Sequence, residues 1–344
     1  GSTLLQRIYM HIKTRNVNTA FKELVNGIHT GQIPTSVQAS RVGEVGVVEE
    51  PFTLSYAYPK ERVLFSAARD ANPFFHLYES LWMLAGRNNI APLDWYSSGY
   101  AKQVRDGDSP YANGAYGYRW RNGVDQLQIL IEHLKRMPIS RRAVLQMWNV
   151  EDDLLKIEKS KDVCCNTCIY FLIDNIGGHR QDGSPAPVFL NMTVCNRSND
   201  LVWGMLGANA VHFSFLQEYI AANLGIEVGV YNQFTNNLHF YTERWSPDKW
   251  LKDHRDYRGE LNLVPLISDA AVFEEELPEF VERNAGPPDT RTYCEPFLNS
   301  VAQPMSQAFY AHKIRNGAAL ERCSHIAADD WRIAATEWIQ RRQK

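Results

Sequence analysis

The stretch VFLNMTVCNRSNDLVWGMLGANAVHFSFLQEYIAANLGIEVGVYNQF, residues 188–234, decides the expected fold because it alternates strand and helix character. Residues 188–197 are short and rich in β-branched and aromatic side chains, which is typical of a strand. After Gly207 apolar side chains recur at helical spacing up to Gly225, and strand character returns over 227–234. This helical face consists of Val211, Phe215, Tyr219 and Ala222. We therefore expect an α/β fold in which the helix packs on a sheet.

Segments on either side extend this pattern. The runs AVLQMWNV at 143–150 and CNTCIYFLI at 165–173 have strand composition and are expected in the same sheet. Helical spacing, or a proline at the start and a glycine at the end, indicates several helices. These are expected over 3–29, 73–86, 123–137 and 327–342. No repeat, linker or low-complexity tract divides the chain, so we expect one domain over residues 3–344.

The composition is that of a globular protein. Of 344 residues, 44% are hydrophobic, which is enough for a large core. The net charge of −3 gives no basic field for binding nucleic acid or a membrane surface. The sequence shows no secretion signal pattern and no apolar run long enough to span a bilayer. Its six cysteines are too sparse for a disulfide framework, so we expect free thiols in a cytoplasmic protein.

Three cysteines lie in or beside the strand expected over 165–173. Side chains alternate along a strand, so Cys165 and Cys168 would point to opposite faces and could not form a redox or zinc pair. No second pair at ligand spacing completes a tetrahedral site, and we expect no metal. Core filling remains an alternative for each thiol, because cysteine is often buried. A nucleophilic thiol needs cations or hydrogen bonds that stabilise the thiolate.

Two segments supply arginines that could do this. Arg141 and Arg142 stand at a strand entrance, and Arg197 and Ser198 stand at a strand exit. Guanidinium groups bind phosphate in a bidentate manner and a hydroxyl adds a further donor. The pattern therefore predicts a phosphate monoester site beside the thiol. The alternative for each arginine is a solvated position on a loop.

Ordered blocks between about residues 20 and 242 resemble the thymidylate synthase family, in its branch of phage-type pyrimidine nucleotide synthases and hydroxymethylases. They are SRVG, FHLYESLWMLAGRNNI, GAYGYRWR, SRRAVLQMWN, CCNTCIYF, NRSNDLVWGMLGANAVHFSFLQEYIA and NLHFYTERW. The resemblance implies that family's α/β (α+β) fold, with one large mixed sheet flanked by helices and packed back to back with its twin across a homodimer. We expect the region from about 246 to 344 to be divergent, because we can place no counterpart of residues 246–327 in the family. A phage origin would place the protein in the host cytoplasm.

The resemblance also assigns catalytic roles. Cys165 matches the nucleophile that adds to C6 of the pyrimidine, although its neighbours read Cys-Cys-Asn where the family usually has Pro-Cys-His. Glu79 matches the glutamate that organises water and protons near C4. Tyr116 matches a tyrosine beside the thiol, and Asp200 an aspartate that bonds the base. Asn209 favours uracil, because a carboxamide can accept from N3–H and donate to O4, whereas a carboxylate would suit cytosine.

The remaining assignments concern the phosphate and the sugar. Arg197, Ser198 and Arg41 match phosphate ligands, and Arg141 with Arg142 match a pair that reaches the other subunit's site. His239 and Tyr241 match residues that bond the sugar 3′-hydroxyl. The substrate implied is a pyrimidine nucleoside monophosphate, with dUMP favoured over dCMP and CMP.

The family takes its one-carbon unit from 5,10-methylenetetrahydrofolate. Thiolate addition to C6 activates C5 for attack on that unit; hydride from the folate then gives a methyl group, and water gives hydroxymethyl. The synthases resemble one another in a tryptophan near the NI block and a short apolar C-terminal peptide. This sequence has SSGYAKQVRDG at 97–107, with Tyr100 or Lys102 nearby, and ends in a cationic amphipathic helix. Both departures predict a hydroxymethyltransferase.

Two alternatives stay open from the sequence. One is a thymidylate synthase that makes dTMP from dUMP behind a rearranged lid. The other is a non-catalytic nucleotide-binding protein on the same scaffold, which would keep the arginines but would not need Cys165.

Overall fold

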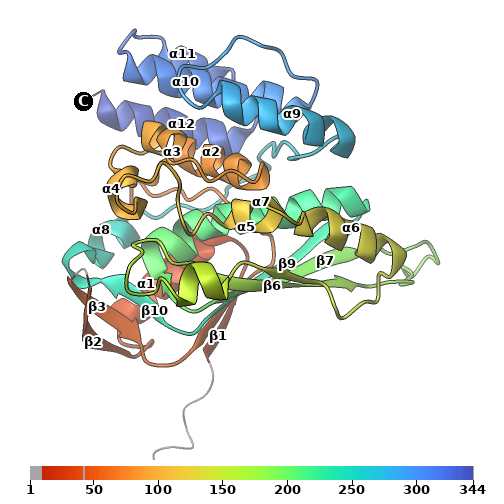
Figure 1. Ribbon diagram of the computed structural model, residues 1–344, viewed down its shortest axis with the longest axis horizontal. Helices are drawn as coiled ribbons and strands as arrows, with labels where there is room; N and C mark the ends of the chain where they lie inside the picture. The colour runs from red at the N-terminus through yellow and green to blue at the C-terminus, as the bar shows by residue number, and fades with distance from the viewer. Residues whose placement is uncertain (1–9, 42, 344) are drawn as a thin grey trace, which may run out of the picture.

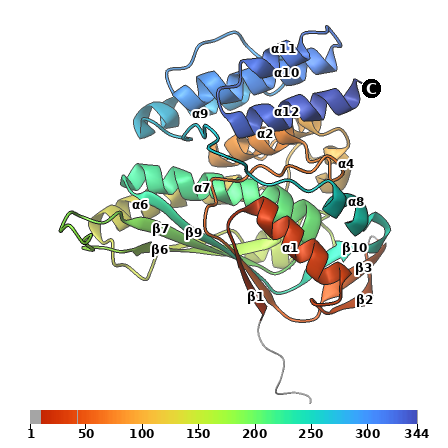
Figure 2. The same cartoon turned by 180° about the vertical axis from the view of Figure 1, so that it is seen from behind.

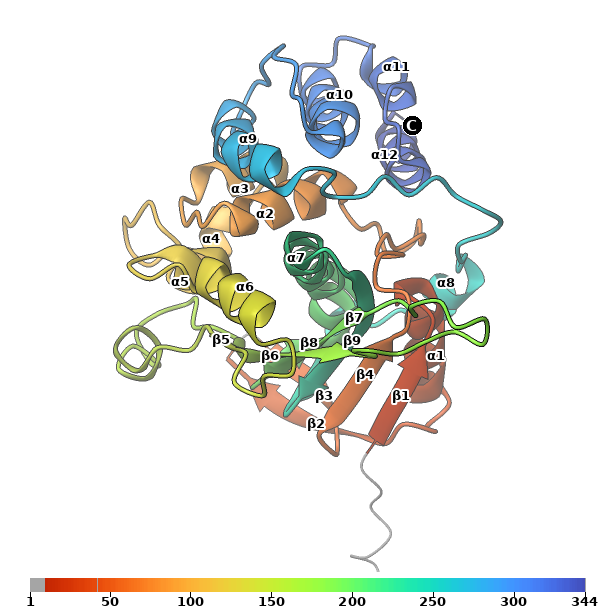
Figure 3. The ribbon, with the colours of Figure 1, turned by 90° about the vertical axis from the view of Figure 1, so that its right-hand side faces the viewer.

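The computed structural model describes residues 10–41 and 43–343. Figures 1 and 3 show its layers: the main sheet, then helix α7 (Asn209–Leu224), then α2 (Pro73–Leu84), and outermost the C-terminal helices. One cluster of buried hydrophobic side chains extends through these layers. No helix in the described part of the chain is long and apolar enough to cross a bilayer.

The main sheet has six strands in the order β1, β4, β9, β7, β6, β5. Their bounds are β1 (Met10–Thr14), β4 (Phe52–Tyr56), β9 (Glu227–Thr235), β7 (Phe189–Asn196), β6 (Asn166–Asp174) and β5 (Val144–Gln146). Parallel pairing joins β1 to β4 and β7 to β9, and the other neighbours are antiparallel. The prediction of one large mixed sheet flanked by helices is confirmed.

Helix α7 connects β7 to β9, as the sequence predicts, and is buried along most of its length. A kink at Gly207 separates it from η2 (Leu201–Ala208), and Gly225 ends it with φ 69. That left-handed conformation favours glycine. A helix that is apolar on most sides needs partners on most sides, and the sheet and α2 provide them.

The expected helix over 3–29 is wrong at its start. Residues 10–14 form β1, in parallel with β4, and residues 3–9 lie outside the described part of the chain. Helix α1 (Val17–His29) begins where the Asn16 side chain accepts hydrogen bonds from the N–H groups of Asn18 and Thr19. Figure 2 shows α1 beside β1.

A second sheet of four short strands, absent from the sequence prediction, lies beside the main sheet (Figure 1). Its order is β2 (Thr35–Ser40), β3 (Gly43–Val48), β10 (Leu238–Tyr241) and β8 (Asn199–Asp200). The parallel pairing of β8 with β10 places Asp200 opposite His239. This small sheet thereby brings together residues that lie far apart in the sequence.

Shorter helices complete the region around α2 and the small sheet. They are α3 (Ala91–Tyr96), α4 (Tyr100–Val104), α5 (Tyr116–Arg121), α6 (Gln126–Arg136), η1 (Val150–Leu154), η3 (Thr242–Arg244) and α8 (Pro247–Lys252). The predicted helices over 73–86 and 123–137 are confirmed as α2 and α6.

The chain from residue 270 onward forms an outer layer of helices on α2. The layer contains α9 (Ala270–Arg283), η4 (Leu298–Ala302), α10 (Gln303–Lys313), α11 (Ala319–Ser324) and α12 (Asp329–Arg342). The Tyr96 ring stacks on Tyr78 and on Phe309, with centroids 4.4 and 4.8 Å away. The Trp338 ring meets Phe74 edge-on at 5.4 Å. The outer layer therefore shares the core of the rest of the chain.

Candidate active site

A cleft of about 1130 Å³ opens between the small sheet, α2, α4 and the start of α7. Many of the side chains that the sequence assigns to the site line it: Arg41, Glu79, Tyr116, Asp200, Asn209 and Tyr241. Pockets for one small molecule usually have volumes of about 300–1,000 Å³, so this cleft has room for more than one ligand. The fold thus brings the predicted residues of α2, α5, α7 and the small sheet to one place.

Cys165 lies at the side of this cleft, directly before β6. Burial raises the pKa of Tyr116, whose side chain lines the cleft, and the nearby Cys165 thiol adds to this shift. The Arg197 backbone N–H donates to Cys165 O at 2.9 Å, and Arg197 Nη2 lies 3.6 Å from Cys165 Sγ. The Cys165 side chain is half-buried and, contrary to expectation, is not among the residues that line the cleft.

The electrostatic environment of Cys165 differs from the sequence expectation. Burial raises the pKa of the Cys165 thiol; Arg197 lowers it, Asp162 raises it, and both effects are smaller than that of burial. Within one chain, the effect of burial on the Cys165 pKa therefore exceeds the expected stabilisation of the thiolate by cations. The thiol of the unliganded protein keeps its proton at neutral pH.

The neighbouring cysteines have other surroundings. Cys164 is only 1% exposed and its pKa is raised by burial, as in a core position. Cys168 faces Cys195 across β6 and β7, and a hydrogen bond with that thiol lowers the pKa of Cys168 to about 6. All of these cysteines are free. Within residues 10–41 and 43–343, no cluster of three histidine, cysteine or carboxylate side chains could hold a metal ion.

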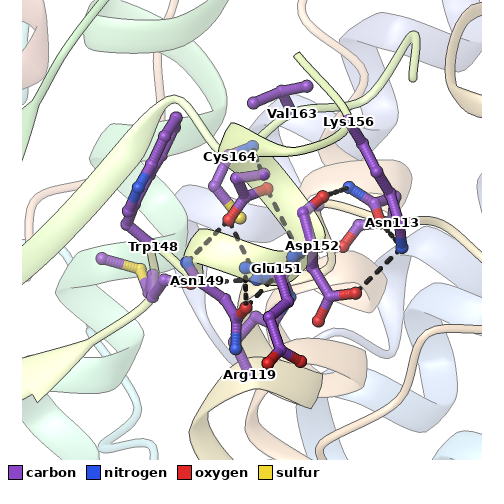
Figure 4. A network of polar contacts seen from close by, with 12 residues as sticks. Asn113, Arg119, Trp148, Asn149, Glu151, Asp152, Lys156, Val163 and Cys164 are labelled. Atoms are coloured by element: carbon purple, nitrogen blue, oxygen red, sulfur yellow. Dashed lines mark hydrogen bonds and ion pairs between the residues drawn. The ribbon is translucent and has the colours of Figure 1, made fainter. Parts of the chain in front are cut away.

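A buried ion pair fixes the segment that leads into Cys165 (Figure 4). Asp153 is fully buried, and its carboxylate accepts from Arg119 Nη1 at 2.9 Å and Nη2 at 3.2 Å. The same carboxylate accepts from the backbone N–H groups of Asn149 at 2.9 Å and Cys164 at 3.3 Å. Because Arg119 belongs to α5, it ties the segment before Cys165 to the helix that carries Tyr116.

Two polar residues stand at the end of the cleft formed by α7. Asn209 Nδ2 donates to Asn199 Oδ1 at 3.0 Å, which uses one of its two amide hydrogens. Asp200 Oδ1 accepts from the N–H groups of Val202 and Trp203 at 2.8 and 2.7 Å, so this carboxylate also caps η2. Burial raises the pKa of Asp200.

Only some of the residues predicted to bind phosphate and sugar line the cleft. Arg41 and Tyr241 line the cleft, and Arg41 Nη2 donates to Lys161 O at 3.3 Å. The Ser198 hydroxyl lies 3.4 Å from His239 Nδ1, next to the cleft wall rather than in it. Arg141 and Arg142 are exposed before β5 and do not line the cleft of their own chain.

The cleft also contains residues that the sequence did not single out. His212 lies one turn after Asn209 on α7, with Nε2 2.9 Å from Glu79 Oε2. Arg69 is buried, donates from Nε to Val202 O at 3.2 Å, and lies over the Trp203 ring. Burial lowers the pKa of Arg69 to about 10. In the sequence, only the three-residue spacing from Asn209 could have indicated that His212 lines the cleft. No sequence pattern indicated a role for Arg69.

The fold and this cleft define a mixed α/β protein with a large polar ligand cleft and a thiol beside it, and the comparison with known proteins identifies its class. Residues 59–270 match the protein family described as thymidylate synthase. The chain is 40% identical to a deoxyuridylate hydroxymethyltransferase of Pseudomonas phage M6, over 96% of this chain and 94% of the relative. It is 33% identical to a deoxyuridylate hydroxymethyltransferase of Bacillus phage SP01, over 72% of this chain and 63% of the relative.

The chain therefore belongs to the thymidylate synthase family. The predicted membership, fold and enzyme class, a one-carbon transferase, are confirmed.

Proposed function

We propose that the protein transfers a hydroxymethyl group to C5 of a pyrimidine nucleoside monophosphate, with dUMP favoured over dCMP and CMP. The observation that carries this proposal is the likeness to the phage M6 enzyme along 96% of the chain, which extends into the C-terminal layer. The position of Cys165 beside the cleft and of Asn209 in its wall supports the same reaction.

Each polar residue has a role in this chemistry. Cys165, once deprotonated, adds to C6 and makes C5 nucleophilic. Asn209 retains its carbonyl oxygen and one amide hydrogen for N3–H and O4 of uracil, where negative charge develops. Arg197 holds the Cys165 segment, and Arg41 stands in the cleft wall for the phosphate.

The cleft fits a folate as well as a nucleotide. When bound, 5,10-methylenetetrahydrofolate would supply the one-carbon unit. Phe75, Trp82 and Trp203 offer aromatic faces for its ring system. Arg69 and Lys102 offer positive charge for its carboxylates, and Arg69 is a buried cation without a carboxylate hydrogen-bonded to it in the described residues.

Two features support water, rather than hydride, as the final nucleophile. Burial and the nearby Glu79 carboxylate raise the pKa of the Tyr100 hydroxyl, so a polar group stands beside Glu79 in the segment where the synthases carry a tryptophan. In α12, Arg341 and Arg342 pair with Asp70, a residue of the cleft wall, at 2.9 and 2.6 Å. The final helix is thus fixed at the rim and differs from a short apolar closing peptide.

We also propose that the active form is a homodimer in which Arg141 and Arg142 complete the partner's phosphate site. Both are exposed beside β5, and the uncovered face of the sheet there carries Val144, Tyr170 and Leu172 with 42 to 52% exposure. An apolar face of this kind favours association. A Cys165→Ser subunit mixed with an Arg141→Ala, Arg142→Ala subunit should recover activity through one intact site. Failure of all such mixtures, with dimers formed, would refute the sharing of arginines.

We further propose that residues 3–344 form one domain to which 246–344 add a helical layer. The shared core and the Arg341 and Arg342 pairs with Asp70 support this. A single calorimetric unfolding transition is expected, and two independent transitions would contradict it.

The activity is tested by incubation with methylenetetrahydrofolate and each of dUMP, dCMP and CMP. The expected result is a product of dUMP heavier by one CH₂O unit, without dihydrofolate. A methyl product with dihydrofolate would instead establish a thymidylate synthase, and binding of dUMP without turnover would favour the non-catalytic alternative.

A further inference from the structure

A buried histidine nitrogen lies in the cleft close to Glu79 but without a hydrogen bond among the described residues. His212 is 5% exposed, and its Nε2 is 2.9 Å from Glu79 Oε2. The two atoms are not aligned for a hydrogen bond, and Nε2 has no hydrogen-bond partner among the described residues. A buried polar atom of this kind normally has a partner, in the protein or in bound water. Both His212 and Glu79 line the cleft, so a small polar ligand can reach them.

The surroundings hold Glu79 and His212 in position. Tyr100 lies close enough to the Glu79 carboxylate for that charge to raise the pKa of the phenol further, after burial, and the His76 ring meets the His212 ring edge-on at 6.4 Å. Burial, His212 and Arg69 keep the pKa of His76 well below its ordinary value, so His76 is neutral. Helix α7 places His212 three residues after Asn209, hence on the face that carries the base-binding carboxamide.

The residue next to the nucleophile is unable to provide an equivalent group. Asn166 is fully buried, and its amide donates to Asn196 inside the sheet. A proton acceptor or water ligand near the base must therefore come from another element, and α7 supplies His212.

We propose that His212 is a catalytic and specificity-determining residue, which with Glu79 holds the water molecule that completes the reaction; this rests on the proposed function. Before this step the uracil carries a methylene group at C5 and a bond from C6 to Cys165 Sγ. The water oxygen bonds to the methylene carbon, and its proton passes to Glu79. The C6–S bond then breaks, Cys165 leaves as thiolate, and the C5–C6 double bond returns. His212 Nε2 aims the water by a hydrogen bond.

The reverse of this step can be measured without folate. The protein is incubated with 5-hydroxymethyl-dUMP in ¹⁸O-water, and incorporation of ¹⁸O into the nucleotide is followed by mass spectrometry. Loss and return of water through the methylene compound exchanges this oxygen. His212→Phe removes the hydrogen-bonding atoms, His212→Gln keeps one within reach, and His312→Phe alters a half-buried histidine of the outer layer as the control.

The expected result is exchange by the native protein and by His312→Phe, and exchange slower by roughly 100-fold in His212→Phe, the loss expected when a reacting water is no longer held in position. His212→Gln should recover at least part of the rate, and all variants should bind dUMP with unchanged affinity. If His212→Phe does not fold, as judged by circular dichroism, His212→Leu takes its place. Native rates in the apolar variant, or equal rates in the apolar variant and His212→Gln, would overturn the role of His212. Absence of exchange in the native protein, with a methyl product in the forward reaction, would overturn the proposed function instead.

Discussion

Replacement of Asp153 by asparagine should destabilise the protein and disturb the nucleophile segment. Asp153 has no exposed side-chain surface, and Arg119 is 10% exposed. The carboxylate accepts from two guanidinium nitrogens and from the N–H groups of Asn149 and Cys164. In Asp153→Asn one oxygen becomes an NH₂ group that faces donors, and the buried guanidinium loses its counter-charge.

The size of the effect follows from burial. Removing one partner of a buried ion pair costs about 3–5 kcal/mol, because the other charge stays buried. At about 2.1 cal/mol/K of unfolding entropy per residue, 344 residues correspond to roughly 0.7 kcal/mol/K. The melting temperature of Asp153→Asn is therefore expected to fall by about 4–7 °C in calorimetry.

The adjacent residue provides a matched control. Asp152 pairs with Lys156 at 2.9 Å, but the two side chains are 44% and 46% exposed (Figure 4). Asp152→Asn should cost at most about 0.5 kcal/mol, since exposed pairs of this spacing contribute little. If Asp153→Asn costs no more than Asp152→Asn, or leaves product formation unchanged, then the Arg119–Asp153 pair does not organise the segment that holds Cys165.

Three further outcomes are expected. Cys165→Ser should abolish turnover, whereas Cys168→Ser should chiefly change stability; turnover by Cys165→Ser would remove Cys165 as nucleophile. Burial raises the pKa of Asp162 to about 6, above its unfolded value, so its contribution to stability is full below about pH 4 and is lost as pH rises through 6. In chemical denaturation, the free energy of unfolding of Asp162→Asn should rise relative to that of the native protein by on the order of 2 kcal/mol between pH 4 and 7. A difference in unfolding free energy that does not change with pH would contradict the raised pKa of Asp162. Asp70→Asn should release the end of α12, seen as faster amide hydrogen exchange over its last turn, and unchanged exchange would show that the Arg341 and Arg342 pairs are dispensable.

The main layers were predictable because their residues repeat with clear periods. The strands around 165–173 and 188–197 and the helix after Gly207 each carry a pattern long enough to read. Residues 10–14 were assigned to a helix because their pairing with β4 leaves no local signal. The small sheet was not predicted for the same reason. Strand β8 contains only Asn199 and Asp200, and only its pairing with β10 makes it a strand.

The sequence motifs identified several site residues correctly. They could not predict properties that depend on distances between side chains. The family resemblance selected Glu79, Asn209 and Tyr116, and the fold brings them into one cleft. The charge on Cys165 could not be deduced, because burial competes with Arg197 and only coordinates weigh the two. From the sequence, the position of His212 on a helical face predicts a core residue. Its role becomes apparent only from its distance to Glu79.

The two departures from the synthase pattern and the contact between His212 and Glu79 favour the same product. Tyr100 presents a hydroxyl to Glu79, His212 leaves an unpaired nitrogen beside the same carboxylate, and Asp70 holds the last turn of α12 at the rim. A hydride transfer needs a dry site, because water competes for the methylene carbon. On our proposal, the polar groups that converge on Glu79 instead hold a water molecule there. Since these groups come from α2, α4 and α7, the choice of product is a property of the assembled cleft, and exchanging Tyr100 alone for tryptophan should not convert the enzyme into a synthase while His212 remains.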